Sequence, residues 1–194
     1  MLDERFVILG AVAATAGTAR YVWATLTGRA QPNRVTWGCW ALAPLVAFAA
    51  ELQEGVGLRS LMTFAVGFGP LLIFLASFVN QDAYWRLGAF DVACGVLSIA
   101  ALAGWALTRS GVVAIVFALV ADLLAGIPTV LKTWSAPQTE EPILFALSTV
   151  NAGVALLTID EWTTAQAAFP AYIAVMGVLL TAIAYRRRWV PCST

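Results

Sequence analysis

The sequence predicts an all-α integral membrane protein with seven transmembrane helices, arranged as two parallel three-helix bundles joined by a linker helix. Three observations predict this class. Of the 194 residues, 61% are hydrophobic and 11% are charged, which leaves too little polar surface to cover a water-soluble protein. The apolar residues fall into seven runs of roughly the 20 residues that a helix needs to cross a bilayer. A similar pattern of hydropathy and turns also recurs along the chain.

The seven apolar runs are each expected to form one helix. Short polar connections separate them, so helices that follow one another in sequence should run antiparallel. Several runs are rich in Gly and Ala, which favours close helix contact in lipid. In order, the expected helices cover about 6–26, 35–51, 58–79, 87–107, 111–133, 142–159 and 165–185.

The recurring pattern divides the chain into two halves. Aligning Pro32 with Pro137 gives an offset of 137 − 32 = 105, which also pairs Ala41-Leu42 with Ala146-Leu147. Three helices reverse the direction of the chain, so a fourth must return it before a second triplet can insert in the same sense. We therefore expect parallel repeats over 1–80 and 110–194, the second with a short basic tail, and a linker helix over 81–109.

Basic residues predict the orientation in the membrane. In the predicted topology, seven of them lie on one side of the membrane and three on the opposite side, and Arg20 lies inside a span. Because Lys and Arg accumulate on the cytoplasmic side, we expect a multi-pass protein of the plasma or inner membrane, with its N-terminus outside and its C-terminus inside. Acidic residues near Met1 argue against a cleaved signal peptide. The majority set is Arg29, Arg34, Arg86, Lys132, Arg186, Arg187 and Arg188, and the minority set is Arg5, Arg59 and Arg109.

One stretch of sequence resembles a known motif. The segment Ile127-Pro128-Thr129-Val130-Leu131-Lys132-Thr133-Trp134, followed by Pro137-Gln138-Thr139-Glu140, resembles the PQ-loop motif of the SWEET and PQ-loop transporter family. In that motif a Pro-Gln pair near a helix end precedes a basic residue and a polar turn. The sequence departs from it in having Thr129 after Pro128, and Ala19-Arg20-Tyr21-Val22-Trp23 in the first repeat contains no proline.

The resemblance implies a transporter. Its solute pathway would lie between the two triplets, in a water-filled crevice that rocking of the bundles opens to each side in turn. We expect an alternating-access facilitator for a small polar solute such as a sugar. The alternatives are a proton-coupled PQ-loop carrier, a vitamin transporter of the nicotinamide riboside type, or a non-transporting receptor or accessory subunit on the same fold.

Composition narrows the expected partners. The chain contains no histidine and no close cysteine spacing, so we expect no metal, no cofactor and no enzymatic activity. Its formal net charge of +0 gives no reason to expect a nucleic-acid partner. The expected partners are a small-molecule solute and the lipid bilayer, and a homo-oligomer stays open.

Asp122 is the first candidate site residue. It lies in the middle of the fifth run, where an isolated carboxylate is costly unless it is neutralised, paired or in contact with water. It could bind substrate hydroxyls or a coupling proton, or belong to a structural ion pair. Arg20 is the expected partner, because Asp122 corresponds to position 122 − 105 = 17 and Arg20 lies about one turn further along that helix. Alternatively, Arg20 snorkels to the interface.

Asn151 and Trp40 are the uncharged candidates for substrate binding. Asn151 lies in the middle of the sixth run and offers two donors and an acceptor to a polar solute, although it could equally join two helices. Trp40 follows Trp37 by about one turn and could stack on a ring-shaped solute or pack in the core. Asp91, near the start of the linker helix, is expected to pair with Arg86 or to cap that helix.

Four prolines inside the apolar runs are candidate hinges. A proline removes one backbone donor and can bend a helix, and paired interruptions are typical of transport sites. These residues are Pro44, Pro70, Pro128 and Pro170. About one turn after Pro128, near the end of the fifth run, Lys132 is expected to snorkel and Trp134 to anchor at the interface.

Overall fold

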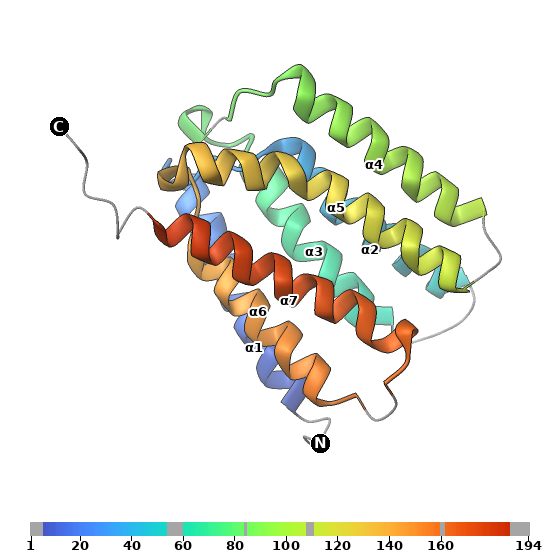
Figure 1. Cartoon of the computed structure of the whole chain (residues 1–194). Helices are drawn as coiled ribbons and strands as arrows, with labels where there is room; N and C mark the ends of the chain where they lie inside the picture. The colour runs from blue at the N-terminus through green and yellow to red at the C-terminus, as the bar shows by residue number, and fades with distance from the viewer. Residues whose placement is uncertain (1–5, 54–59, 84, 108–110, 160–161, 187–194) are drawn as a thin grey trace.

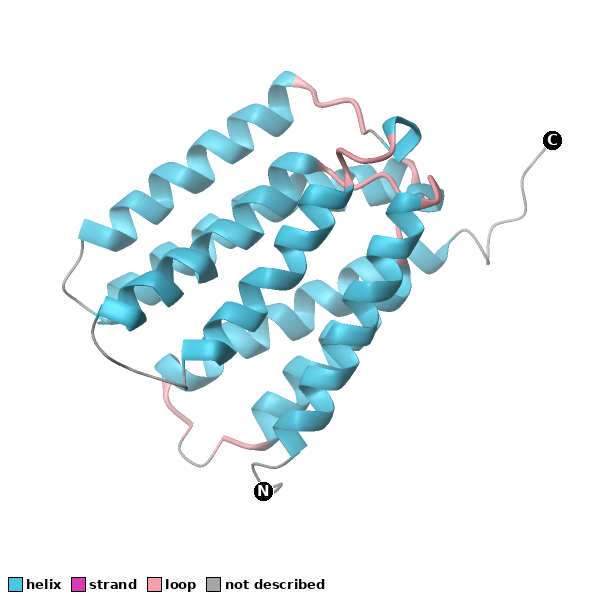
Figure 2. Ribbon diagram, turned by 180° about the vertical axis from the view of Figure 1, so that it is seen from behind, coloured by secondary structure: helices cyan, strands magenta, loops and turns pink. Residues whose placement is uncertain are grey.

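The structure, a computed structural model, describes residues 6–53, 60–83, 85–107, 111–159 and 162–186. This part of the chain folds into seven α-helices and two short 3-10 helices, with no strand (Figures 1 and 2). The α-helices are α1 (Phe6–Leu26), α2 (Arg34–Gln53), α3 (Ser60–Ala76), α4 (Ala89–Leu107), α5 (Gly111–Ser135), α6 (Pro142–Leu157) and α7 (Thr164–Tyr185). The 3-10 helices are η2 (Gln81–Ala83) and η3 (Pro137–Thr139).

The predicted helices are confirmed as helices, and their observed ends lie close to the predicted ones. The four candidate hinge prolines all lie inside α-helices, Pro44 in α2, Pro70 in α3, Pro128 in α5 and Pro170 in α7. Of the basic residues counted for orientation, Arg5, Arg59, Arg109, Arg187 and Arg188 lie outside the described residues.

In the described part of the chain, two helical stretches are long and apolar enough to cross a membrane. They are Ile115–Ser135 and Ala167–Tyr185, with mean hydropathies of 1.9 and 2.0. Only 33% and 28% of these stretches are buried inside the structure, whereas the apolar core helix of a soluble protein is mostly buried. Shorter apolar stretches occupy Val66–Ala76, Ala89–Gly104 and Pro142–Leu157.

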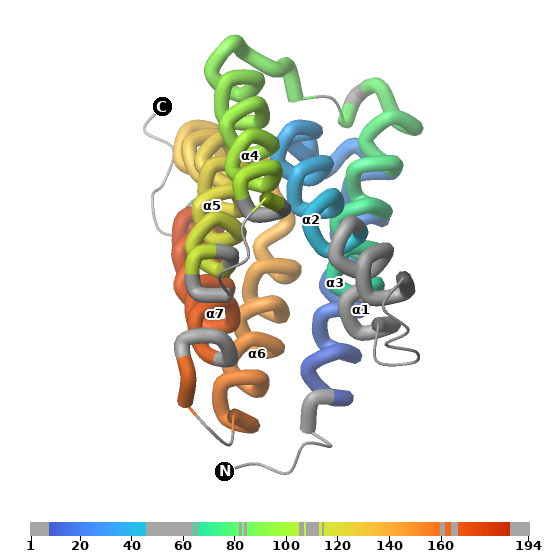
Figure 3. Tube along the Cα trace, turned by 90° about the vertical axis from the view of Figure 1, so that its right-hand side faces the viewer, coloured from blue at the N-terminus to red at the C-terminus, as the bar shows by residue number. Residues whose placement is uncertain are grey.

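The helices pack in two groups of three with α4 at one side. In one group α3 contacts both α1 and α2, and in the other α7 contacts both α5 and α6. Figure 3 shows the two groups on opposite sides of the molecule. The groups meet through contacts of α1 with α6 and of α2 with α5, and α4 packs on α5 and α2.

The connections α1–α2, α3–α4 and α5–α6 gather at one end of the bundle, together with the end of α7. Hydrogen bonds join them: the Asn80 amide donates to the Leu26 carbonyl (2.9 Å), and the Gln31 N–H donates to the Thr139 carbonyl (2.8 Å). We call this the basic end, because the five described residues of the larger basic set lie in or next to these connections. They are Arg29, Arg34, Arg86, Lys132 and Arg186.

The sequence explains why α1 ends and α2 begins here. Gly28 adopts a φ of 73°, a left-handed conformation that glycine accepts without steric cost. The Arg29 N–H then returns to the Ala24 carbonyl (2.8 Å), as in a Schellman motif. Asn33 caps α2, since its Oδ1 accepts the N–H groups of Val35 (3.0 Å) and Thr36 (3.3 Å).

An aromatic cluster forms the core between the two groups. The ring centroids of Tyr21 and Trp37 lie 4.9 Å apart, those of Trp37 and Trp40 lie 5.2 Å apart, and Phe145 packs edge-on against Tyr21 at 6.4 Å. Each such pair contributes roughly 0.5–1.5 kcal/mol beyond the burial of its area. The core therefore joins α1 and α2 of one group to α6 of the other.

Candidate functional site

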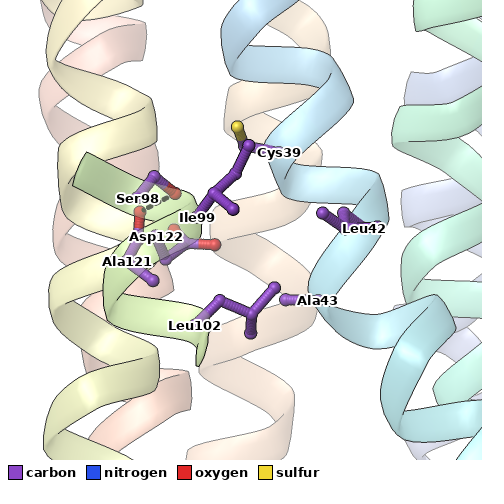
Figure 4. Close-up of a pocket in the computed structure, with 8 residues that line it drawn as sticks. All are labelled: Cys39, Leu42, Ala43, Ser98, Ile99, Leu102, Ala121 and Asp122. Carbon is purple, nitrogen blue, oxygen red and sulfur yellow. Dashed lines mark hydrogen bonds between the residues drawn. The ribbon is translucent and has the colours of Figure 1, made fainter. Parts of the chain in front are cut away.

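Asp122 lies on the side of α5 that faces α2 and α4. It borders a small cavity of about 10 Å³, which has room for about one water molecule. Figure 4 shows its carboxylate pointing into the space between these helices. The cavity is lined by Cys39, Leu42 and Ala43 from α2, Ser98, Ile99 and Leu102 from α4, and Ala121 and Asp122 from α5.

Side chains of α2 and α4 hold the backbone of α5 next to this cavity. The Trp40 indole N–H donates to the Asp122 carbonyl (3.1 Å), and the Ser98 hydroxyl donates to the Ala121 carbonyl (2.7 Å). One turn further on, the Thr36 hydroxyl donates to the Ala125 carbonyl (2.7 Å). These carbonyls lie on one face of α5, so the three bonds fix the position of α5 against its neighbours without using the Asp122 carboxylate.

The carboxylate itself faces two polar side chains, Tyr172 of α7 and Trp40 of α2. The Tyr172 hydroxyl is buried and makes no well-aligned hydrogen bond to any group in the described part of the chain. Cys39 and Ser98 complete the polar surroundings. The site can accept a proton or bind a water molecule or small cation, but in this conformation it has no room for a sugar.

A second polar cluster closes the basic end. The Lys132 ammonium group forms an ion pair with Glu140 (2.5 Å), and the side chains of both residues are at most 1% exposed. The Tyr21 hydroxyl donates to the other carboxylate oxygen of Glu140 (2.6 Å), and Lys132 also donates to the Gln31 carbonyl. We call Tyr21, Gln31, Lys132 and Glu140 the end cluster. It joins α1 and the α1–α2 loop to α5 and the α5–α6 loop.

Arg20 does not pair with Asp122, so this prediction was wrong. Its Nε atom instead contacts the Glu141 carboxylate at 3.0 Å, with the Arg20 side chain 51% exposed. The partner is close because α6 begins directly after Glu141 and lies against α1. Arg20 thus adds an exposed contact between the two groups of helices and is not placed at the Asp122 cavity.

Asn151 and Trp40 lie at contacts between the two groups. The Asn151 Oδ1 atom packs over Gly10 so closely that a Cβ built on this glycine would lie 2.4 Å from it. Trp40 packs edge-on against Trp37 and lies over Gly126 of α5. In this conformation both side chains pack between helices, and their role in binding stays a prediction.

Asp91 takes the second of its two predicted roles, and Lys132 differs from its predicted one. Asp91 does not pair with Arg86; its Oδ2 accepts the Gly88 N–H (2.6 Å), which caps α4, and its Oδ1 accepts the Asn33 amide (2.8 Å). Lys132 does not snorkel to the interface, because its carboxylate partner Glu140 is buried with it.

Sequence reasoning missed several residues of both clusters: Tyr21, Gln31 and Glu140 at the basic end, and Cys39, Ser98 and Tyr172 around Asp122. The sequence did contain a signal for Glu140. This acidic residue follows the basic Lys132 by eight residues (140 − 132), with only one short connection between them, so an ion pair could be expected. Ser98 and Tyr172 are polar groups inside apolar runs, which is the signal that singled out Asp122. Cys39 gave none, since a cysteine in an apolar run is ordinary.

No group of three or more His, Cys, Asp or Glu side chains that could hold a metal ion is found in the described part of the chain. Comparisons with protein-family models, with curated proteins and with solved structures find no match for this chain.

Proposed function

We propose that this chain is a multi-pass membrane carrier of a small polar solute, which opens by a rocking motion of two parallel three-helix bundles. The bundles are residues 1–80 and 110–194, with 81–109 as the linker that contains α4. The N-terminus lies outside and the C-terminus in the cytoplasm, so that the basic end faces inward. The observation that carries the proposal is that the contacts between the two bundles repeat when the bundles are exchanged.

The membrane location is supported by the apolar outer surface. Large apolar side chains on α4 point away from the bundle, including Val96 (61% exposed), Leu97 and Val92. Exposed contiguous apolar surface of this kind is unfavourable in water and favourable in lipid. The low burial of the two most apolar helical stretches agrees with this.

Helix contacts support the repeat. Exchanging α1 with α5, α2 with α6 and α3 with α7 turns the α1–α3 contact into α5–α7 and the α2–α3 contact into α6–α7. The same exchange turns the α1–α6 contact into α5–α2, and all of these contacts are present. This exchange is what a two-fold axis between parallel repeats requires.

Individual residues follow the same register. Gly17 of α1 lies against Leu144 of α6. The repeat offset of 105 relates position 17 to position 122 (17 + 105) and position 144 to position 39 (144 − 105). The residues at these related positions, Asp122 and Cys39, line one cavity. The candidate carboxylate therefore occupies, in the second bundle, the position that a glycine occupies in the first.

A second pair gives the same result. Tyr21 of α1 packs against Phe145 of α6. The same shift gives 21 + 105 = 126 and 145 − 105 = 40, and Trp40 lies 3.2 Å from a Cβ built on Gly126. The offset that was set by two loop prolines thus also pairs side chains deep between the bundles.

The positions of the two polar clusters support a carrier. Asp122 lies where the second bundle meets α2 of the first, so that separation of the bundles would widen its cavity. The end cluster ties the bundles together at the basic end, and its Gln31 and Glu140 belong to the two loops related by the repeat. In this conformation the basic end is closed.

Proton-linked transport is a second candidate, and the cavity beside Asp122 favours it. The carboxylate has room for about one water molecule and faces the Tyr172 hydroxyl. Such a group can take up and release a proton as the bundles move.

The test is a thermal-shift screen of detergent-purified protein against sugars, amino acids and nucleosides, followed by counterflow of each stabilising compound in proteoliposomes. A bound solute raises the apparent Tm, and a carrier also exchanges it across the membrane. Binding without exchange would favour the receptor alternative. A chain that fractionates with soluble proteins would contradict the proposal altogether.

A further inference from the structure

A second opening lies at the basic end, between the segment that leads into α4 and the last turns of α5. Its volume is about 260 Å³, close to the lower limit of small-molecule pockets of roughly 300 Å³. Figure 1 shows α4 and α5 side by side. We call this opening the α4–α5 groove; its lining includes Trp85, Arg86, Phe90, Asp91, Leu131 and Lys132.

One part of the groove is basic. Arg86 is exposed, and its guanidinium forms no ion pair with another described residue. The Lys132 ammonium group also lines the groove, 5.4 Å from the centre of the Trp85 ring, but its charge is balanced by Glu140. The carboxylate of Asp91 forms no ion pair with Arg86; its two oxygens accept the Gly88 N–H and the Asn33 amide.

The opposite part of the groove is apolar and leads away from the basic end. Phe90 is 53% exposed and Leu131 is 52% exposed. From Leu131 an exposed apolar strip continues along one face of α5 through Leu123, Val120 and Val116, at the spacing of a single helix face. The groove thus combines the exposed cation of Arg86 with an exposed apolar strip.

We propose that the α4–α5 groove binds the headgroup of one anionic phospholipid, with Arg86 at the phosphate and the acyl chains along Phe90 and Leu131. An exposed arginine suits phosphate through its planar set of donors. The apolar strip selects a lipid over a free phosphate, because only a lipid fills both parts. This inference rests on the proposed membrane location and does not depend on transport.

The experiment uses the full chain, delipidated in an uncharged detergent, and counts bound lipids by native mass spectrometry. The probes are dioleoyl phosphatidylglycerol, phosphatidylcholine with the same chains, and glycerol phosphate. We expect one retained phosphatidylglycerol, weaker retention of phosphatidylcholine and none of glycerol phosphate. Equal retention of the two lipids, or saturable binding of glycerol phosphate alone, would overturn the proposal.

Two substitutions locate the site. Arg86→Gln should weaken retention of phosphatidylglycerol about five-fold, the effect of one basic residue at an anionic headgroup, and Arg86→Lys should restore most of it. The matched control is Arg29→Gln, which removes an exposed charge from the same end. Unchanged retention in Arg86→Gln, or an equal loss in Arg29→Gln, would contradict the assignment to this groove.

A third variant and a fractionation keep the outcomes separate. Should Arg86→Gln fail to fold, Phe90→Ser tests the apolar part and should also weaken retention. If the chain fractionates with membranes but retains no phosphatidylglycerol, only this inference fails. If the chain does not fractionate with membranes, the proposed carrier function fails as well.

Discussion

Asp122 brings a carboxylate into the middle of an apolar helix, and its neighbours decide what this group can do. The Trp40 indole N–H donates to the backbone carbonyl of Asp122 (3.1 Å). The contact between α2 and α5 therefore does not depend on the charge of the Asp122 side chain. The carboxylate faces a buried hydroxyl, that of Tyr172, and a cavity the size of a water molecule. It can therefore change its protonation state without breaking the packing of α5.

Asp122→Asn tests this role. The amide has nearly the same shape but takes up no proton, so proton-linked transport should lose its pH dependence while the apparent Tm changes little. The measurement is solute uptake into proteoliposomes between about pH 5 and 8, the range in which functional carboxylates and histidines are tuned to titrate. An unchanged pH profile in the mutant would remove Asp122 from proton coupling.

The Lys132–Glu140 pair is the second residue-level feature. Both side chains are buried, and a buried pair offsets its desolvation cost only while both partners are present. Glu140→Gln should leave Lys132 charged and uncompensated, and lower the free energy of unfolding by about 3–5 kcal/mol. The measurement is the thermal or chemical unfolding of the purified protein.

A milder variant provides the control for this prediction. Tyr21→Phe removes one hydrogen bond to Glu140 and should cost about 1–3 kcal/mol, while the joint change of Lys132→Met and Glu140→Leu should recover most of the stability. Glu140→Gln with wild-type stability would mean that the pair is not buried as described.

The sequence did not predict which residues of the site contact one another. Asp122 was predicted from its depth in an apolar run, because any charge there needs an explanation. The partner of Arg20 could not be predicted in the same way, because Glu141 lies 121 residues away in a loop. Whether Arg20 meets Asp122 or Glu141 depends on how α6 enters the bundle. The sequence predicts an interfacial position for Lys132, because a lysine near a helix end usually reaches water.

At the scale of elements, close contact between α1 and α6 fixes how the bundles meet. A Cβ at Gly17 would lie 3.2 Å from the Leu144 Cα, and one at Gly10 would lie 2.4 Å from Asn151 Oδ1. These two glycines are seven residues apart and lie on one face of α1. Small residues at such positions let helices approach closely in lipid.

Gly10→Ala should therefore destabilise the protein, by about 1–3 kcal/mol as for other overpacked contacts. Gly153→Ala on α6 is the matched control, because a Cβ there has no neighbour within 4 Å, and should be neutral or slightly stabilising, by up to about 1 kcal/mol. Apparent Tm values measure both.

Asn151→Ala distinguishes packing from solute binding at the same contact. If Asn151 is mainly a packing residue, this change should rescue much of the stability lost in Gly10→Ala and leave solute binding intact. If it is a ligand for the solute, Asn151→Ala should weaken binding in a protein of normal stability. Equal Tm values for Gly10→Ala with and without Asn151→Ala would show that the two side chains do not interact.

Helices were the most predictable elements, because each apolar run has the length of a span and ends at a polar turn. The end of α1 follows from Gly28 and the start of α2 from Asn33, both readable signals. The position of α4 could not be predicted from the sequence, because the sequence of an apolar helix does not indicate which neighbour it packs on. In the structure, α4 lines the Asp122 cavity through Ser98 and Leu102.

At the scale of the whole molecule, the described conformation is closed at the basic end. The end cluster, the Gln31–Thr139 backbone bond (2.8 Å) and the Arg20–Glu141 contact all join the two bundles there. At Asp122 the expected water-filled crevice is reduced to a cavity that has room for about one water molecule. A carrier must therefore break these contacts to admit a solute from this side.

Labelling of Cys39 tests this opening most directly and needs no knowledge of the solute. Cys39 borders the Asp122 cavity, so with Cys94→Ala and Cys192→Ser it is the single native thiol that reports access. Gln31→Cys with Thr139→Cys, added to that background, allows a disulfide to lock the basic end. The reagent is a membrane-impermeant maleimide added from the side of the basic end.

We predict that the peptide containing Cys39 carries the maleimide in the reduced protein, that the disulfide blocks this labelling, and that a reductant, removed before labelling, restores it. Cys39 that reacts equally with the lock closed, or that never reacts from this side in a folded, membrane-inserted protein, would contradict the rocking of the two bundles.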